Sequence, residues 1–161
     1  MRGSARGGSV RRSVAPAPVA PRPSAAKGKK RVLFVCIGNS CRSPMAEAFA
    51  RAYGSDVLEA RSAGLAPASI VQELTKQVLK ERNVPAEDLF PKGLELMLGE
   101  PFDVVVNLSG LQLPQLWKTQ PPRVVTWPVP DPIGKDEAVY REVAARIEAL
   151  VMGLILELRP A

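Results

Sequence analysis

The residues best suited to chemistry lie in one short segment, from Cys36 to Ser43. It reads Cys-Ile-Gly-Asn-Ser-Cys-Arg-Ser and follows an apolar run, Val32–Cys36, that is typical of a buried strand. A cysteine thiolate is a strong nucleophile, and the guanidinium of Arg42 offers a planar fork that matches two oxygens of a tetrahedral anion. This spacing predicts a loop that wraps a phosphate-like oxyanion, with Cys36 as the attacking nucleophile.

The residues between the cysteine and the arginine suit such a loop. Gly38 and Asn39 tolerate positive φ, so the chain can curl with successive N–H groups pointing inward. Ser43–Pro44 is typical of a helix N-cap followed by proline at the first helical position, and that helix would direct its free N–H groups at the same point. The predicted substrate-binding residues are Ile37, Gly38, Asn39, Ser40, Cys41 and Ser43.

The activation of Cys36 has to come from the loop itself, because the sequence contains no histidine. This absence excludes Ser–His–Asp and Cys–His catalysis and histidine-ligated metal sites. Loop N–H groups, the helix dipole and Arg42 would favour the thiolate. Ser43 can donate its hydroxyl to the sulfur and so make it a better leaving group. Activation of this kind requires neither a metal nor a cofactor, and we expect neither.

Hydrophobic patterning predicts the elements that position this loop. Strands are expected over Val32–Cys36, Val57–Ala60, Asp103–Leu108 and Arg123–Trp127, and helices from Ser43 to about Ala52, over Ser69–Arg82 and over Tyr140–Leu158. Strands that alternate with helices imply right-handed crossovers. The expected fold is α/β: a small, doubly wound, four-stranded parallel sheet, flavodoxin-like, with helices on both faces. Ligands of such folds bind beyond the carboxyl ends of the strands, where Cys36 lies.

Residues 1–30 differ in composition from the rest of the chain. They contain eight of the 22 basic residues, no acidic residue and no aromatic residue, which predicts a disordered, basic Pro/Ala/Arg-rich tail. An organelle transit peptide and a basic arm for anionic surfaces are the alternatives.

Residues 31–161 form the one predicted domain. They carry 14 basic against 16 acidic residues, a net charge of −2, so we do not expect the domain to bind nucleic acid. No apolar run approaches the ~18 residues of a membrane span. With only two cysteines there is no disulfide framework, and we expect a cytoplasmic protein. The sequence carries no signal for a particular oligomeric state.

The segment 32–48 resembles the signature of low-molecular-weight protein tyrosine phosphatases. Arg61–Gly64, Asp103–Leu108 and Trp127–Pro132 also resemble that family in order and spacing. The resemblance implies a metal-independent hydrolase that acts on a phosphorylated protein or a small aryl phosphate through a phosphocysteine. It also implies that Asn39 and Ser62 brace the loop by hydrogen bonds.

Hydrolysis of a phosphate monoester needs a proton for the leaving oxygen, and without histidine a carboxylate must supply it. Asp131 precedes Pro132 just after the fourth predicted strand, so it would lie at the same edge of the sheet as Cys36. Asp-Pro is also a common turn dipeptide. The general acid of the resembled family occupies such a pair in this region, which favours Asp131 over its nearest competitor, Asp136.

Two departures from the resembled family bear on the substrate. Ile133 and Gly134 follow Asp131-Pro132, where many tyrosine phosphatases carry aromatic residues that flank the substrate ring. The loop is also similar to that of arsenate reductases on the same fold. Thioredoxin-coupled members use two further cysteines as a relay, and Ser109 stands where one of them would be needed.

We therefore expect a phosphatase first, with an arsenate reductase that uses an external thiol as the alternative. A phosphate-binding regulatory module without turnover is a third possibility. Cys41 has two interpretations: it only packs, or it traps oxidised Cys36 as a reversible disulfide.

Overall fold

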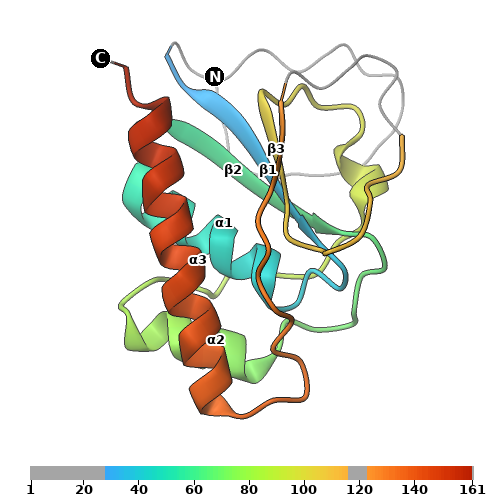
Figure 1. Ribbon diagram of the computed structural model, residues 1–161, viewed down its shortest axis with the longest axis vertical. Coiled ribbons are helices and arrows are strands. Elements are labelled where there is room, and N and C mark those ends of the chain that lie inside the picture. Colours follow the sequence, from blue (N-terminus) through green and yellow to red (C-terminus); the bar gives the residue numbers. More distant parts are fainter. Residues whose placement is uncertain (1–27, 116–122, 161) are drawn as a thin grey trace.

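The structure is a computed structural model that describes residues 28–115 and 123–160. The predicted tail therefore lies outside the described residues up to position 27. The elements in chain order are β1 (Lys30–Cys36), α1 (Arg42–Gly54), β2 (Leu58–Gly64), α2 (Glu73–Glu81), the 3₁₀ helix η1 (Leu94–Met97), β3 (Val104–Asn107), β4 (Val124–Thr126) and α3 (Glu137–Leu158) (Figure 1). Within the described residues, no helix combines the length and the apolar content that crossing a membrane requires.

The strands form one parallel sheet in the order β2-β1-β3-β4. The chain runs outward from β1 to β2 and then returns past β1 to β3, so the winding reverses between β1 and β3. The predicted doubly wound α/β fold is confirmed. In such a sheet the loops that follow the two central strands open a crevice at the carboxyl edge. Cys36 is the last residue of β1 and lies at this point.

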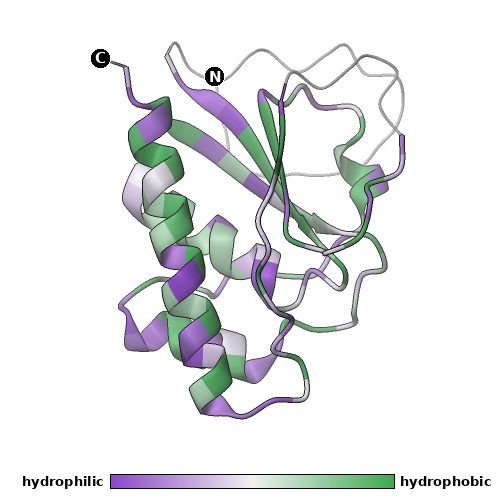
Figure 2. Ribbon diagram, in the orientation of Figure 1, coloured by the Kyte–Doolittle hydropathy of each residue, from purple (hydrophilic) through white to green (hydrophobic). Residues whose placement is uncertain are grey.

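Both faces of the sheet are buried, which explains the unbroken apolar runs of β1 and β3. Val32 and Phe34 belong to a large core with the inward residues of α1, α2 and α3. Leu33 and Val35 belong to a smaller core on the opposite face, which η1 covers through Leu94. Helices thus lie on both faces, as expected, although one face carries a 3₁₀ helix. Figure 2 shows apolar stretches along the strands and mixed stripes on α3.

The start of α1 corrects a prediction. The helix begins at Arg42, with Cys41 as the N-cap and no side-chain capping bond, so Ser43 is not the cap. The hydroxyl of Ser43 contacts Cys36 and Asn39 and does not cap the helix. Pro44 still lies in the first turn, where a missing N–H costs nothing.

The helix expected from Ser69 is also shorter than predicted, because α2 starts at Glu73. Ile70 was expected on its apolar stripe but is 55% exposed. Residues 69–72 are not helical, and this part of the chain bonds the oxyanion loop: Ala68 N donates to Gly38 O at 2.9 Å and Gln72 N to Ser40 O at 3.1 Å. The tertiary contact therefore overrides the local helical pattern.

Candidate active site

The sulfur of Cys36 contacts Ser43, in the first turn of α1, through two groups. Cys36 is 2% exposed. Its Sγ lies 2.9 Å from Ser43 Oγ and accepts from Ser43 N at 3.4 Å. Both contacts come from Ser43, so the sulfur has hydrogen-bond partners although the chain contains no histidine. The predicted partnership of Cys36 and Ser43 is present in the geometry.

Asn39 holds the curl of the loop. Its φ is 52°, the left-handed region, which asparagine tolerates better than most residues, whereas Gly38 does not take positive φ. The Nδ2 of Asn39 donates to Ser43 Oγ at 2.8 Å and to Ser62 Oγ at 3.0 Å, and Oδ1 accepts from Lys92 N at 3.0 Å. The structure therefore brings Asn39 and Ser62 together in the bracing arrangement that the resemblance implied.

The outer side of the loop is bonded through its carbonyl groups. Ile37 O and Gly38 O accept from the segment after β2, and Ser40 O accepts from Thr75 Oγ1 at 2.9 Å. Because these carbonyls point away from the curl, the N–H groups of the loop turn toward its concave side and form an anion nest. Gly64 permits this close packing: a Cβ there would lie 2.7 Å from Ile37 O.

Arg42 is fixed from the two neighbouring strand ends. Its side chain is 5% exposed. Nη1 donates to Leu108 O at 2.7 Å, after β3, and to Val129 O at 3.1 Å, after β4. The opposite edge of the planar fork, Nε and Nη2, is the edge that two oxygens of an anion would contact.

Of the two candidate acids, the structure brings Asp131 to this arginine. Asp131 Oδ2 lies 3.5 Å from Arg42 Nη2, and the side chain is 38% exposed. Its Oδ1 accepts from Ile133 N at 3.1 Å, which fixes the carboxylate in its loop. Asp136 instead caps α3 and accepts from Val139 N. The geometry therefore favours Asp131 as the carboxylate that serves the site.

Cys41, the last loop residue before α1, is buried against hydroxyl groups. Its Sγ lies 3.5 Å from Tyr140 OH and 3.7 Å from Ser40 Oγ. Burial raises the pKa of the Cys41 thiol above its ordinary value, although the neighbouring hydroxyl groups oppose this shift. These contacts give Cys41 a packing role. That it also traps oxidised Cys36 stays a prediction.

Sequence reasoning missed a charged group under the loop. Glu47 is 1% exposed and accepts a hydrogen bond from Ser62 Oγ. It pairs with Arg51 one turn later and with Lys92, whose Nζ lies 3.9 Å from Glu47 Oε1. The available signal was a single carboxylate between Ala46 and Ala48 in a helix that packs on the sheet.

The fold and the loop define a cysteine-based class of α/β enzymes, in which the nucleophile follows the first strand. Residues 31–161 match the family described as "Low molecular weight phosphotyrosine protein phosphatase", and the chain belongs to this family.

Relatives of known name include two arsenate reductases. The chain is 33% identical over 131 residues to "Glutaredoxin arsenate reductase" of Synechocystis sp., covering 80% of this chain and 98% of that protein. It is 32% identical over 127 residues to "Arsenate reductase 1" of Bacillus cereus, covering 78% and 93%.

Solved structures include both an arsenate reductase and a phosphatase. "An arsenate reductase in the phosphate binding state" superposes with a TM-score of 0.73 at 32% identity, covering 80% of this chain and 98% of that one. A low-molecular-weight protein tyrosine phosphatase from T. tengcongensis superposes with a TM-score of 0.68 at 30% identity, covering 81% and 100%.

Proposed function

We propose that this protein reduces arsenate to arsenite with an external thiol as reductant. The observation that carries the proposal is likeness over the whole domain to proteins named arsenate reductases, one of them solved in a phosphate-binding state. Arsenate and phosphate are tetrahedral oxyanions of the same shape. The loop that holds Cys36 and Arg42 suits either anion.

The first step is nucleophilic attack. The Cys36 thiolate attacks arsenic, and the arsenic oxygen opposite the sulfur leaves as water after accepting protons. Arg42 and the loop N–H groups hold the remaining oxygens, and Asp131, 3.5 Å from the guanidinium, supplies a proton. The product is an S–As(V) bond on Cys36.

The second step is the reduction. A thiol RSH attacks the sulfur of Cys36, the S–As bond breaks, and its electron pair stays on arsenic, which leaves as arsenite. Cys36 is then a mixed disulfide, and a second RSH releases its thiolate as RSSR forms. The sum is arsenate and two thiols giving arsenite, one disulfide and one water.

Two features of the chain support a reductant that comes from outside the protein. Ser109, where a relay cysteine would be needed, is buried and its hydroxyl bonds Asn107 Oδ1 at 2.6 Å. The only other thiol, Cys41, is buried with a raised pKa, which makes it a slow attacking group. One relative bears the name of glutaredoxin, a protein dithiol, which supports an external donor.

Hydrolysis of phosphate monoesters is the second candidate, and one contact favours it. The carboxylate of Asp131 beside Arg42 is placed as a general acid for a leaving oxygen. The family description and the T. tengcongensis structure name phosphatases. Ile133, 48% exposed, follows Asp131-Pro132, so an aromatic substrate ring finds no aromatic partner there.

The decisive experiment compares both reactions with one protein preparation and a metal chelator throughout. Arsenate is supplied with glutathione, with glutaredoxin and glutathione, or with thioredoxin, and arsenite is quantified; an aryl phosphate is supplied separately. We expect arsenite formation that depends on thiol. Aryl phosphate turnover without arsenite would contradict the proposal in favour of the phosphatase. Saturable phosphate binding with neither reaction would indicate a regulatory module.

A further inference from the structure

A buried carboxylate lies two hydrogen bonds from the oxyanion loop. Glu47 accepts from Ser62 Oγ, and Ser62 accepts from Asn39 Nδ2 at 3.0 Å. The same Nδ2 donates to Ser43 Oγ, which contacts the sulfur of Cys36. A continuous chain of contacts therefore links Glu47 to the nucleophile.

This placement creates an electrostatic problem. A buried carboxylate without a counter-charge is strongly disfavoured, and near a site for a multiply charged anion it would also repel that anion. The repulsion is weakly screened because Glu47 is 1% exposed. A cation next to Glu47 removes both penalties.

Lys92 provides such a cation. Its side chain is 11% exposed, with Nζ 3.9 Å from Glu47 Oε1. The ammonium also donates to Phe90 O at 3.2 Å and lies 4.7 Å from the centre of the Phe90 ring. The backbone N–H of Lys92 donates to Asn39 Oδ1, so Lys92 contacts both Glu47 and Asn39.

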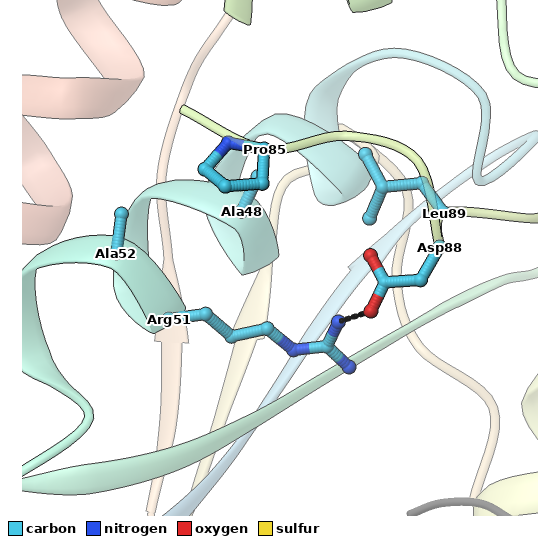
Figure 3. A pocket seen from close by; sticks show the side chains of 6 residues that line it. All are labelled: Ala48, Arg51, Ala52, Pro85, Asp88 and Leu89. Atoms are coloured by element: carbon cyan, nitrogen blue, oxygen red, sulfur yellow. Dashed lines mark hydrogen bonds and ion pairs between the residues drawn. The ribbon is translucent and has the colours of Figure 1, made fainter. Parts of the chain in front are cut away.

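Arg51 also pairs with Glu47, but its position is different. Its side chain is 38% exposed, and it divides its guanidinium between Glu47 and Asp88 at a surface pocket that Ala48, Ala52, Pro85 and Leu89 complete (Figure 3). Figure 3 shows the guanidinium of Arg51 directed to Asp88, and the contacting nitrogen is Nη1. Arg51 makes the closer contact with Glu47 but is more exposed to water and shares its charge with Asp88, whereas the Lys92 ammonium lies farther from Glu47 but deeper in the structure.

We propose that Lys92 is a positioning residue that sets the oxyanion affinity of the loop by neutralising Glu47 and anchoring Asn39. The inference rests on the oxyanion site of the proposed function and holds for either reaction at that site. Its test therefore measures binding of inorganic phosphate and needs no turnover.

The first variants are Lys92→Met, which keeps the stem and removes the charge, and Lys92→Arg, which keeps the charge. Calorimetry with inorganic phosphate at pH 7.5 should show about tenfold weaker binding for Lys92→Met, a moderate coupling within one network, and near wild-type binding for Lys92→Arg. Lys80→Met, an exposed lysine on α2, is the matched control and should bind as the wild type does.

The double variant Glu47→Gln/Lys92→Met separates this role from a packing role. With no carboxylate to neutralise, it should recover phosphate affinity to within about threefold of the wild type, whereas a packing defect would persist. If Lys92→Met does not fold, refolding and phosphate binding of the double variant support the proposal. Wild-type affinity in folded Lys92→Met, or an undiminished defect in the double variant, would overturn it.

The pH dependence gives an independent readout. Burial lowers the pKa of Lys92, opposed chiefly by Glu47; Arg51, Arg61 and Asp88 also face the ammonium. Below that pKa the ammonium is charged, so phosphate affinity should fall as pH rises through it. Lys92→Arg stays charged and should shift this alkaline limb upward. An alkaline limb that is identical in the wild type and in Lys92→Arg would contradict the role of the charge.

Discussion

At Cys36 the protein replaces a histidine base by fixed donors. The sulfur contacts the hydroxyl and the backbone N–H of Ser43, and the anion it would attack is held by Arg42, whose Nη1 is bonded to two carbonyl groups. Donors fixed before the reaction need no reorganisation when charge develops, which is the main source of catalysis at oxyanion sites. The attack proposed for the Cys36 sulfur therefore depends on the positions of Asn39 and Arg42.

Asp131 gives a prediction at the same scale. Asp131→Asn should slow hydrolysis of an aryl phosphate by about a hundredfold or more, because the leaving oxygen then departs without a proton. The loss should be larger for phenyl phosphate than for p-nitrophenyl phosphate, whose phenolate leaves more easily. Steady-state kinetics on both esters measure the ratio.

Asp136→Asn is the matched control for this prediction. Asp136 caps α3, and asparagine caps a helix about as well as aspartate. Activity should therefore be retained. If Asp136→Asn lost activity and Asp131→Asn kept it, the general acid would be assigned to the wrong carboxylate.

At the scale of elements, the contact between β2 and the oxyanion loop depends on Gly64. An added Cβ would lie 2.7 Å from Ile37 O and 2.9 Å from Asn39 N, both backbone atoms that can move only with the loop. Gly64→Ala should therefore weaken phosphate binding by about tenfold or more, as misplacement of a binding group does. Gly99→Ala, where a Cβ meets nothing within 4 Å, is the control. Equal phosphate affinity in both variants would show that the loop tolerates the shift.

A second element contact, between α1 and α3, should show in the pH dependence of stability. Tyr53 OH donates to Glu148 Oε2 at 2.7 Å, and burial, with this contact, raises the pKa of Tyr53 to about 12. Because the pKa is higher in the folded state, the contact stabilises that state fully below the ordinary tyrosine pKa of about 10. This stabilisation is lost as the pH rises through the pKa of the folded state.

Tyr53→Phe should accordingly lower the free energy of unfolding by about 1 kcal/mol at neutral pH, the value of one hydrogen bond. The difference between wild type and variant should narrow from pH 10 upward. Urea unfolding at several pH values measures it. A difference that stays constant to pH 11 would mean that the phenol does not titrate with the contact.

The sequence predicts these elements best where burial decides the pattern, on both faces of a strand or along one face of a helix. β1, β3 and α3 follow from apolar runs and three- and four-residue spacing, and the structure places them within a few residues of the expected bounds. The start of α2 does not follow, because the segment before it bonds the loop of Cys36 and not its own helix. The hydrophobic spacing within this segment does not reveal its hydrogen bonds to a loop that lies far away in the sequence.

At the scale of the whole molecule, the topology follows from the sequence, and one segment of the sequence contains the candidate nucleophile, whereas the contacts that support the site do not follow from it. Cys36, Asn39 and Arg42 lie in one segment whose residue types reveal the anion loop. Glu47 and Lys92 are 45 residues apart and meet only through the order of the strands. No pattern in the sequence around either residue indicates that the two pair.

The choice between arsenate reduction and phosphate monoester hydrolysis also depends on the molecule as a whole. Phosphatase and reductase share the first step at Cys36, so the loop predicts both. They differ in what arrives second, water or a thiol, and the chain encodes this only through Ser109 and the residues after Asp131. The phosphatase favoured by the sequence is therefore placed second, since whole-domain likeness supports the reductase better.

The most direct test of the account compares wild type with Cys36→Ser in two measurements on the same samples. Arsenite formation from arsenate with glutathione and glutaredoxin should be present in the wild type and absent in Cys36→Ser. Calorimetric phosphate affinity should remain within several-fold, because the donors of Arg42 and of the loop stay in place. Arsenite formation by Cys36→Ser at the wild-type rate would contradict the central claim that this sulfur attacks the oxyanion.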